Sequence, residues 1–254
     1  MIALLYHSYR SEWLKRKRSL AAWLVIVGAL FTPTIQALIQ IIRPAKTPAR
    51  FAAPDFWTSY FQDTWQTMVS LLLPMGIILA VSLVAQLEYK NNTWKQLHAT
   101  PQPYPVIFFS KLAVLLTMEV QLFLLFNMAI VLSAVVTAAV LPSVTLPSGP
   151  IPVAHYLRES SLYFVYALPI VALQYLLSLL FRNFLVSVGT GLILLVTSLI
   201  LLSWEYAYVF PYSYSMLYFI KRFPDLNLTA WALGWTGTLL IAAYLLYITK
   251  SDRS

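Results

Sequence analysis

The chain has 254 residues, of which 60% are hydrophobic and 10% are charged, and its mean hydropathy is +0.73. Soluble domains are roughly 45–50% apolar, so this composition excludes a water-soluble globule and indicates one polytopic membrane domain. The sequence has no cysteine, which excludes disulfides and thiolate chemistry, and its three histidines are scattered, so we expect no metal site. The net charge of +8 comes from basic residues at the ends of apolar segments. We therefore expect membrane lipid as a partner and no nucleic acid.

Residues 1–19 predict a basic amphipathic helix that lies on the membrane face. Apolar residues recur there at helical spacing: Ile2, Leu5, Tyr6, Tyr9 and Trp13. A basic run from Lys15 to Arg18 follows. A cleaved signal peptide is the alternative, but the next apolar run is longer than a usual h-region and shows no clear small-residue cleavage site. We expect a retained first span.

The rest of the chain, residues 20–254, predicts an all-α domain of six transmembrane helices. We place them at Leu20 to Ile42, Val69 to Leu87, Val106 to Leu141, Leu162 to Phe181, Phe184 to Leu202 and Leu228 to Ile248. The third run is too long for a bilayer, so its start projects into the interface or cytosol. The fourth and fifth runs are separated by little more than Arg182 and Asn183, which predicts a tight helical hairpin.

The distribution of basic residues predicts the orientation of these spans, because an excess of Lys and Arg stays cytoplasmic. With the N-terminus inside, 11 of the 17 basic residues fall on the cytosolic side, and the other six are Arg43, Lys46, Arg50, Arg158, Lys221 and Arg222. We therefore expect a multi-pass protein of the inner or plasma membrane with both termini in the cytoplasm.

A polar insert between the second and third spans predicts a short interfacial helix and a stiff connector at residues 88–105. On a helical wheel, one arc carries Glu88, Asn91, Lys95 and His98, and the other carries Tyr89, Thr93, Trp94 and Leu97. Pro101, Pro103 and Pro105 then prevent helix continuation, until Pro105 can open the next helix.

Two interpretations of this insert remain open from the residues alone. It is either an amphipathic loop that rests on lipid or a docking element for a cytosolic partner. The docking interpretation is favoured by Trp94 and Tyr89, because aromatic residues are enriched at interface hot spots, whereas Glu88 and Lys95 can provide charge register.

The stretch EYKNNTWKQLHATPQPYPVIFFSKL resembles the cytosolic signature of ABC-2-type transporter permeases. Four residues match that pattern: Glu88 at the end of the second span, Leu97, Pro101, and Lys111 at the start of the third. Family members often have a Gly-Thr or similar pair after the Glu. Here Asn92, Thr93 and Trp94 occupy that place, as in the branch that resembles bacteriocin (lantibiotic) immunity permeases.

The resemblance implies a permease subunit of an exporter, with a coupling helix that docks on a separate ATPase subunit. That subunit would bind ATP and Mg²⁺, because this chain has no G-x-x-x-x-G-K-[ST] motif and so needs no cofactor of its own. A second permease subunit would complete the complex as a homo- or heterodimer. The implied docking residues are Glu88, Tyr89, Asn91, Trp94, Lys95, Leu97 and His98.

Three further features carry open alternatives. Ser187, Gly189 and Gly191 form a small-residue patch that either packs inside the subunit or, as the resemblance implies, lies at the dimer seam. The segment 203–227 is either an aromatic belt or, by the same resemblance, a set of short re-entrant helices at the exit, with Glu205, Lys221 and Arg222 near the external mouth. Glu119 in the third span is either a functional carboxylate or one that receives a structural hydrogen bond from Gln121 or a neighbouring helix.

Two other classes of function are considered. An intramembrane enzyme, such as an acyltransferase, would need a nucleophile, base or metal cluster at lipid depth, and the sequence offers no H-E-x-x-H and no paired acids in its spans. A secondary transporter usually shows internal repeats, and we find none that is convincing. We therefore assign no catalytic residue.

Overall fold

The computed structural model describes residues 2–17, 19–90, 103–147, 149–181 and 183–251, and every regular element in these ranges is helical. Six helical stretches in the described ranges are long and apolar enough to cross a membrane. They are Leu20–Ile42, Phe56–Gln86, Tyr104–Val140, Val153–Leu180, Phe184–Ser203 and Leu228–Thr249. The predicted fold class, an all-α membrane protein with six spans, is confirmed. Helices satisfy their own backbone hydrogen bonds, which an apolar solvent cannot do for them.

Two spans begin earlier than the hydropathy of the sequence predicts. The second is one rod formed by α4 (Phe56–Thr67), the π-helical turn η1 (Met68–Leu72) and α5 (Leu73–Lys90). The fourth, α8 (Val153–Leu180), begins nine residues before the expected Leu162. Polar and aromatic residues dilute the hydropathy of both extensions, but the aromatic rings pack against one another: Phe61 stacks on Tyr156 at 4.3 Å between ring centroids.

A proline accounts for the π-helical turn in the second span. Pro74 is the second residue after η1 and has no N–H to donate to the carbonyl of Ser70, and its ring would clash with the preceding turn of a regular helix. The helix widens at this point instead of breaking, as helices do where the regular hydrogen-bond ladder is interrupted.

The remaining spans follow the expected bounds closely. They are α2 (Leu20–Ile42), α7 (Tyr104–Val140), α9 (Phe184–Ile200) and α11 (Leu228–Ser251). The predicted hairpin between the fourth and fifth spans is confirmed, since residues 181–183 join α8 to α9. Asn183 caps α9 by accepting a hydrogen bond from the backbone N–H of Leu185 at 2.9 Å.

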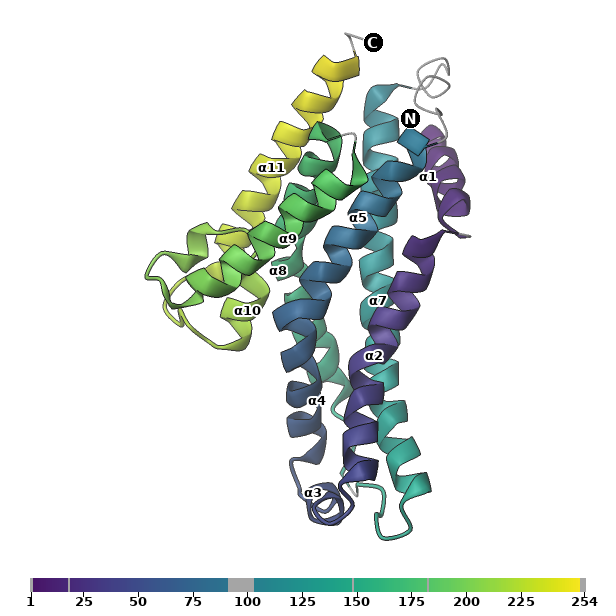
Figure 1. Ribbon diagram of the computed structural model, residues 1–254, viewed down its shortest axis with the longest axis vertical. Helices are drawn as coiled ribbons and strands as arrows, with labels where there is room; N and C mark the ends of the chain where they lie inside the picture. The colour runs from purple at the N-terminus through teal and green to yellow at the C-terminus, as the bar shows by residue number, and fades with distance from the viewer. Residues whose placement is uncertain (1, 18, 91–102, 148, 182, 252–254) are drawn as a thin grey trace.

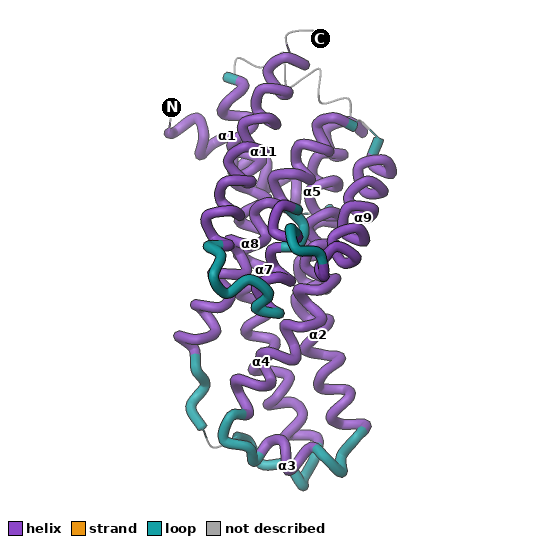
Figure 2. The backbone as a smooth tube through the Cα atoms, turned by 90° about the vertical axis from the view of Figure 1, so that its left-hand side faces the viewer, coloured by secondary structure: helices purple, strands orange, loops and turns teal. Residues whose placement is uncertain are grey.

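Different helices form the two ends of the bundle (Figure 1). One end, here called the α1 end, carries α1 (Ile2–Arg16), the end of α5, the start of α7 and the end of α11. The other, the α3 end, carries α3 (Thr47–Phe51), the start of α4 and the end of α7. The link between α9 and α11, with the short helix α10 (Tyr214–Phe219), lies about halfway along the long axis, as Figure 2 also shows from the side.

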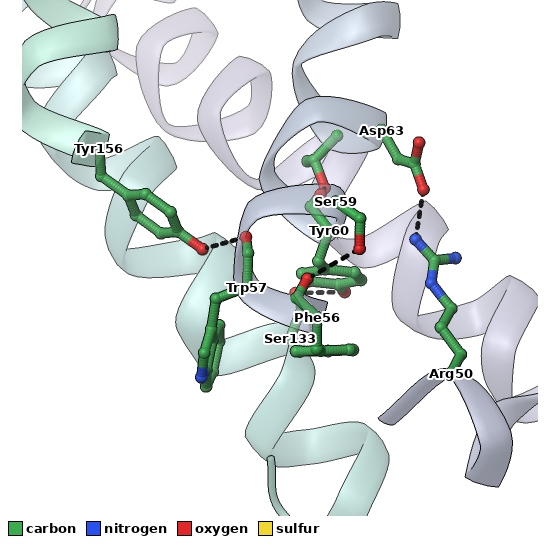
Figure 3. A network of polar contacts seen from close by, with 9 residues as sticks. Arg50, Phe56, Trp57, Ser59, Tyr60, Asp63, Ser133 and Tyr156 are labelled. Atoms are coloured by element: carbon green, nitrogen blue, oxygen red, sulfur yellow. Dashed lines mark hydrogen bonds and ion pairs between the residues drawn. The ribbon is translucent and has the colours of Figure 1, made fainter. Parts of the chain in front are cut away.

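Side-chain contacts hold the α3 end together (Figure 3). The hydroxyl of Tyr60 lies 2.8 Å from that of Ser133 on α7, and the hydroxyl of Tyr156 on α8 donates to the carbonyl of Trp57 at 2.7 Å. Arg50 on α3 forms an ion pair with Asp63 on α4. These contacts join four helices where the chain turns back.

The N-terminal helix α1 packs alongside the first half of α7 through polar contacts. Ser8 donates to Ser110 at 3.0 Å, and Arg16 donates to Gln121 at 3.1 Å. The face that contacts α7 therefore includes Ser8 and Arg16, which are buried, whereas the apolar Leu5 is exposed. These two polar side chains turn inward because α7 offers them hydrogen-bond partners.

We expect Trp65→Ala to lower the free energy of unfolding by about 3 kcal/mol, because it removes a fully buried ring and leaves a cavity among its aromatic neighbours. Thermal unfolding of the purified protein in detergent measures this as a lower midpoint temperature. Trp23→Ala is the matched control, since the Trp23 side chain is 65% exposed on α2. Equal losses from the two substitutions would contradict the packing described above.

Candidate functional site

The predicted docking segment connects the end of α5 to the start of α7, and both of these helix ends lie at the α1 end. Glu88 and Tyr89 belong to the last turn of α5. The other predicted docking residues, Asn91, Trp94, Lys95, Leu97 and His98, lie outside the described residues. Helix α7 begins with Tyr104 and Pro105, so Pro105 stands in the first turn, as expected.

A buried polar cluster lies between α5, α8 and α9, and the amide of Gln174 is its centre. The nitrogen of this amide donates to the hydroxyl of Ser82 at 3.0 Å and to the backbone carbonyl of Ser187 at 3.0 Å. The hydroxyl of Ser178 lies 3.0 Å from that of Ser187. Gln174 is fully buried, so these partners replace the water that its amide loses.

The same amide also holds the link between α9 and α11. Tyr212 donates its hydroxyl proton to the amide oxygen of Gln174 at 2.8 Å. Burial raises the pKa of the Tyr212 hydroxyl above its usual range, because the charged phenolate would lack water there. The segment 203–227 therefore reaches into the helix bundle, to a residue less than two turns from the end of α8.

The three small residues predicted at the dimer seam point in different directions. Ser187 is 2% exposed and belongs to the Gln174 cluster. A Cβ atom on Gly191 would lie 2.5 Å from the amide oxygen of Gln174 and 2.8 Å from Ile78, so this glycine permits close packing of α9 on α5 and α8. Gly189 has no atom within 4 Å of such a Cβ. Ser187 and Gly191 thus serve packing within the subunit, and Gly189 lies on the outer face.

The residues predicted at the external mouth all belong to the link between α9 and α11. Glu205, Lys221 and Arg222 are exposed. Arg222 donates to the backbone carbonyl of Ser203 at 2.7 Å, and Ser203 precedes Glu205 by two residues in the sequence. The left-handed backbone of Lys221, with φ of 50°, turns the chain after α10 so that this contact can form.

Glu119 does not receive the hydrogen bond that the sequence allows from Gln121. Neither carboxyl oxygen of Glu119 has a hydrogen-bond partner among the described residues, and the amide oxygen of Gln121 accepts a hydrogen bond from Arg16. Among all the residues that the structure describes, no group of three or more His, Asp or Glu side chains is placed to hold a metal ion.

Sequence signals for the Gln174 cluster are weak. Gln174 is visible as a polar residue inside an apolar span, which is a reason to expect a buried partner. Its bond to Tyr212 joins residues 38 positions apart, and no spacing rule connects the two. The sequence indicates that the tyrosine-rich segment 203–227 is a distinct feature, but it gives no reason to choose Tyr212 within it.

Six apolar spans and a link drawn into the bundle define a multi-pass membrane protein. The family model described as ABC-2 family transporter protein matches residues 9–198. The match covers three quarters of the chain and includes the first four spans, most of the fifth and the whole of residues 88–105. The chain belongs to the ABC-2 transporter family. No curated protein matches it.

We expect Gly191→Ala to lower the free energy of unfolding by about 1–3 kcal/mol, because the added methyl group displaces either Ile78 or the Gln174 amide from its partners. Gly189→Ala is the control. Its methyl group meets open space, and alanine favours a helix over glycine, so stability should be unchanged or slightly higher. Thermal unfolding in detergent compares the two, and equal stability of both variants would place Gly191 outside the packed interface.

Proposed function

We propose that this chain is the membrane-spanning permease subunit of an ABC exporter, driven by ATP hydrolysis in a separate nucleotide-binding subunit. The observation that carries the proposal is membership of the ABC-2 transporter family over residues 9–198, which implies association with an ABC ATPase. The sequence supports this division of labour, because it contains no phosphate-binding loop. The family match favours this role over an intramembrane enzyme or a secondary transporter.

In this proposal, residues 88–105 are the docking element for the ATPase subunit. The segment connects α5 to α7 at the α1 end, which the basic-residue distribution assigns to the cytosol. Trp94 and Leu97 would fill a cleft on the partner, and Glu88 would set the register. Both termini would lie on the same, cytoplasmic side.

The Gln174 cluster provides a physical route from the docking element into the bundle. Ser82, which is bonded to Gln174, precedes Glu88 by six residues, or about 9 Å along α5. A displacement of the end of α5 would therefore act directly on α8, on α9 through Ser187, and on Tyr212 of the segment 203–227. Closure of the ATPase subunits would in this way reach the external mouth.

The cargo and the second subunit belong to the same proposal. Asn92, Thr93 and Trp94 favour the bacteriocin immunity branch of the family, for which the cargo would be an antimicrobial peptide. A second permease subunit, identical or related, would pack against outward-facing surfaces of the first and fifth spans. Gly189 on α9 has open space beside it, which supports this placement.

We expect Trp94→Ala and Glu88→Ala to reduce both copurification of the ATPase subunit and export, because each removes a docking contact. Loss of a buried interface anchor typically costs about 2 kcal/mol or more, which is roughly a thirtyfold loss of affinity. The measurement is the yield of the ATPase in a pull-down of the tagged permease from membranes, together with a transport assay.

Lys46→Ala is the control for these variants, since Lys46 is exposed at the α3 end, opposite the docking segment. It should change neither the pull-down nor the transport. Wild-type recovery and export with both docking variants would return residues 88–105 to an amphipathic loop that rests on lipid.

A further inference from the structure

An apolar cavity of about 190 Å³ lies between α2, the η1–α5 helix and α7. Leucine, isoleucine, valine and methionine side chains form most of its lining. It lies just below the outer surface of the bundle, because three of the lining side chains are partly exposed there: Val27 (58%), Phe31 (48%) and Met75 (37%). A molecule dissolved in the surrounding apolar phase can approach the cavity from this side.

Glu119 from α7 borders this cavity and is its single charged lining residue among those described. The side chain is 6% exposed, and both carboxyl oxygens are buried without a hydrogen-bond partner in the described part of the chain. A carboxylate without a partner in apolar surroundings is strongly unfavourable, so such a group is normally neutral or faces a cation. An unsatisfied carboxyl beside an empty apolar space is the arrangement that a cationic guest would complete.

Two cations on or against α7, Arg16 and Lys111, do not serve Glu119. Arg16 donates to Gln121 and lies over the ring of Trp13, 3.7 Å from its centroid. Lys111 precedes Glu119 by eight residues, which corresponds to about 12 Å along α7. The carboxyl is thus available to a charge that comes from outside the chain.

We propose that this cavity is a binding site for an organic ammonium ion with an apolar body, whose head contacts the carboxylate of Glu119. A cavity of about 150 Å³ holds a benzene molecule, so 190 Å³ accommodates an alkyl body of about six to eight carbons. The ammonium group supplies the charge and the N–H donors that the two carboxyl oxygens lack.

The walls of the cavity fit an entry route. Gly28 on α2 and Gly76 on α5 both belong to its lining, and a Cβ atom at either position would meet its nearest neighbour at 3.7 Å or more. The missing side chains leave room between these two helices. The widened turn η1 contributes Met68 and Leu72 to the same wall, and such turns occur frequently at functional sites.

The assignment as a cargo site rests on the proposed exporter function, whereas binding itself does not. The test therefore uses the full chain alone, purified in dodecyl maltoside, and radiolabelled octylamine as the probe. Octylamine is protonated at neutral pH, and 1-octanol is its uncharged counterpart of the same length. We expect saturable binding of octylamine. 1-Octanol should displace the bound probe at least tenfold less well than unlabelled octylamine does.

Two variants and one control locate the site. Glu119→Gln should weaken octylamine binding at least tenfold and leave the affinity for 1-octanol unchanged. Gly76→Phe should remove the binding of both compounds, because its ring fills the cavity. Glu205→Gln, at an exposed carboxylate outside the cavity, should bind as the wild type does. Equal competition by 1-octanol and octylamine in the wild-type protein would overturn the proposal without any variant, and so would wild-type affinity in Glu119→Gln.

The source of the ammonium ion is resolved by a second competitor. An ethanolamine phospholipid that displaces octylamine identifies the guest as a lipid headgroup with its chain, and failure to displace it identifies a free amphiphile. Both results depend on octylamine binding at Glu119. Failure of that binding refutes the site and leaves the exporter role standing, because copurification with the ATPase is measured separately.

Discussion

The amide of Gln174 is the polar contact on which the arrangement of the bundle depends. Inside an apolar assembly each buried donor and acceptor needs a protein partner, and this amide supplies partners to Ser82, Ser187 and Tyr212 at once. Its removal would take a partner from α5, α9 and the segment 203–227 together, although Ser82 and Ser187 would keep their bond to each other at 3.1 Å. The three parts are thereby fixed to α8 at a single point.

The hydrogen bonds of Gln174 connect some parts of the molecule more directly than others. Helix α5 carries the cluster through Ser82 and ends at the predicted docking segment, so the part of the chain proposed to meet the ATPase is rigidly joined to the part that holds Tyr212. The α3 end is organised differently, by stacked aromatic rings and by the Tyr60–Ser133 and Tyr156–Trp57 hydrogen bonds. Force applied at the α1 end would reach the link between α9 and α11 before it reaches α3.

The sequence predicts much of this fold because lipid imposes a simple rule on composition. Apolar runs of about 20 residues gave all six spans, and two polar residues between long runs gave the α8–α9 hairpin. The early starts of α4 and α8 were not predicted, because a helix stabilised by aromatic partners such as Phe61 and Tyr156 does not need a high hydropathy.

The functional residues were less predictable, for a reason of geometry. Small residues in a span allow close approach, but their spacing does not say to which neighbour, and Ser187 and Gly191 turned out to face the subunit's own core. The contact of Gln174 with Tyr212 depends on how the chain returns after α9, which no local pattern encodes. The roles of Glu88 and Trp94 remain predictions drawn from the polar insert and the family resemblance.

We propose above all that this chain is the permease subunit of a complex in which another subunit hydrolyses ATP. The most direct measurement is ATP hydrolysis by the purified chain alone, compared with the complex that a tagged chain recovers from its native membrane. The account predicts no hydrolysis by the isolated chain and copurification of a nucleotide-binding subunit that hydrolyses ATP. Robust ATP hydrolysis by the chain alone would contradict it.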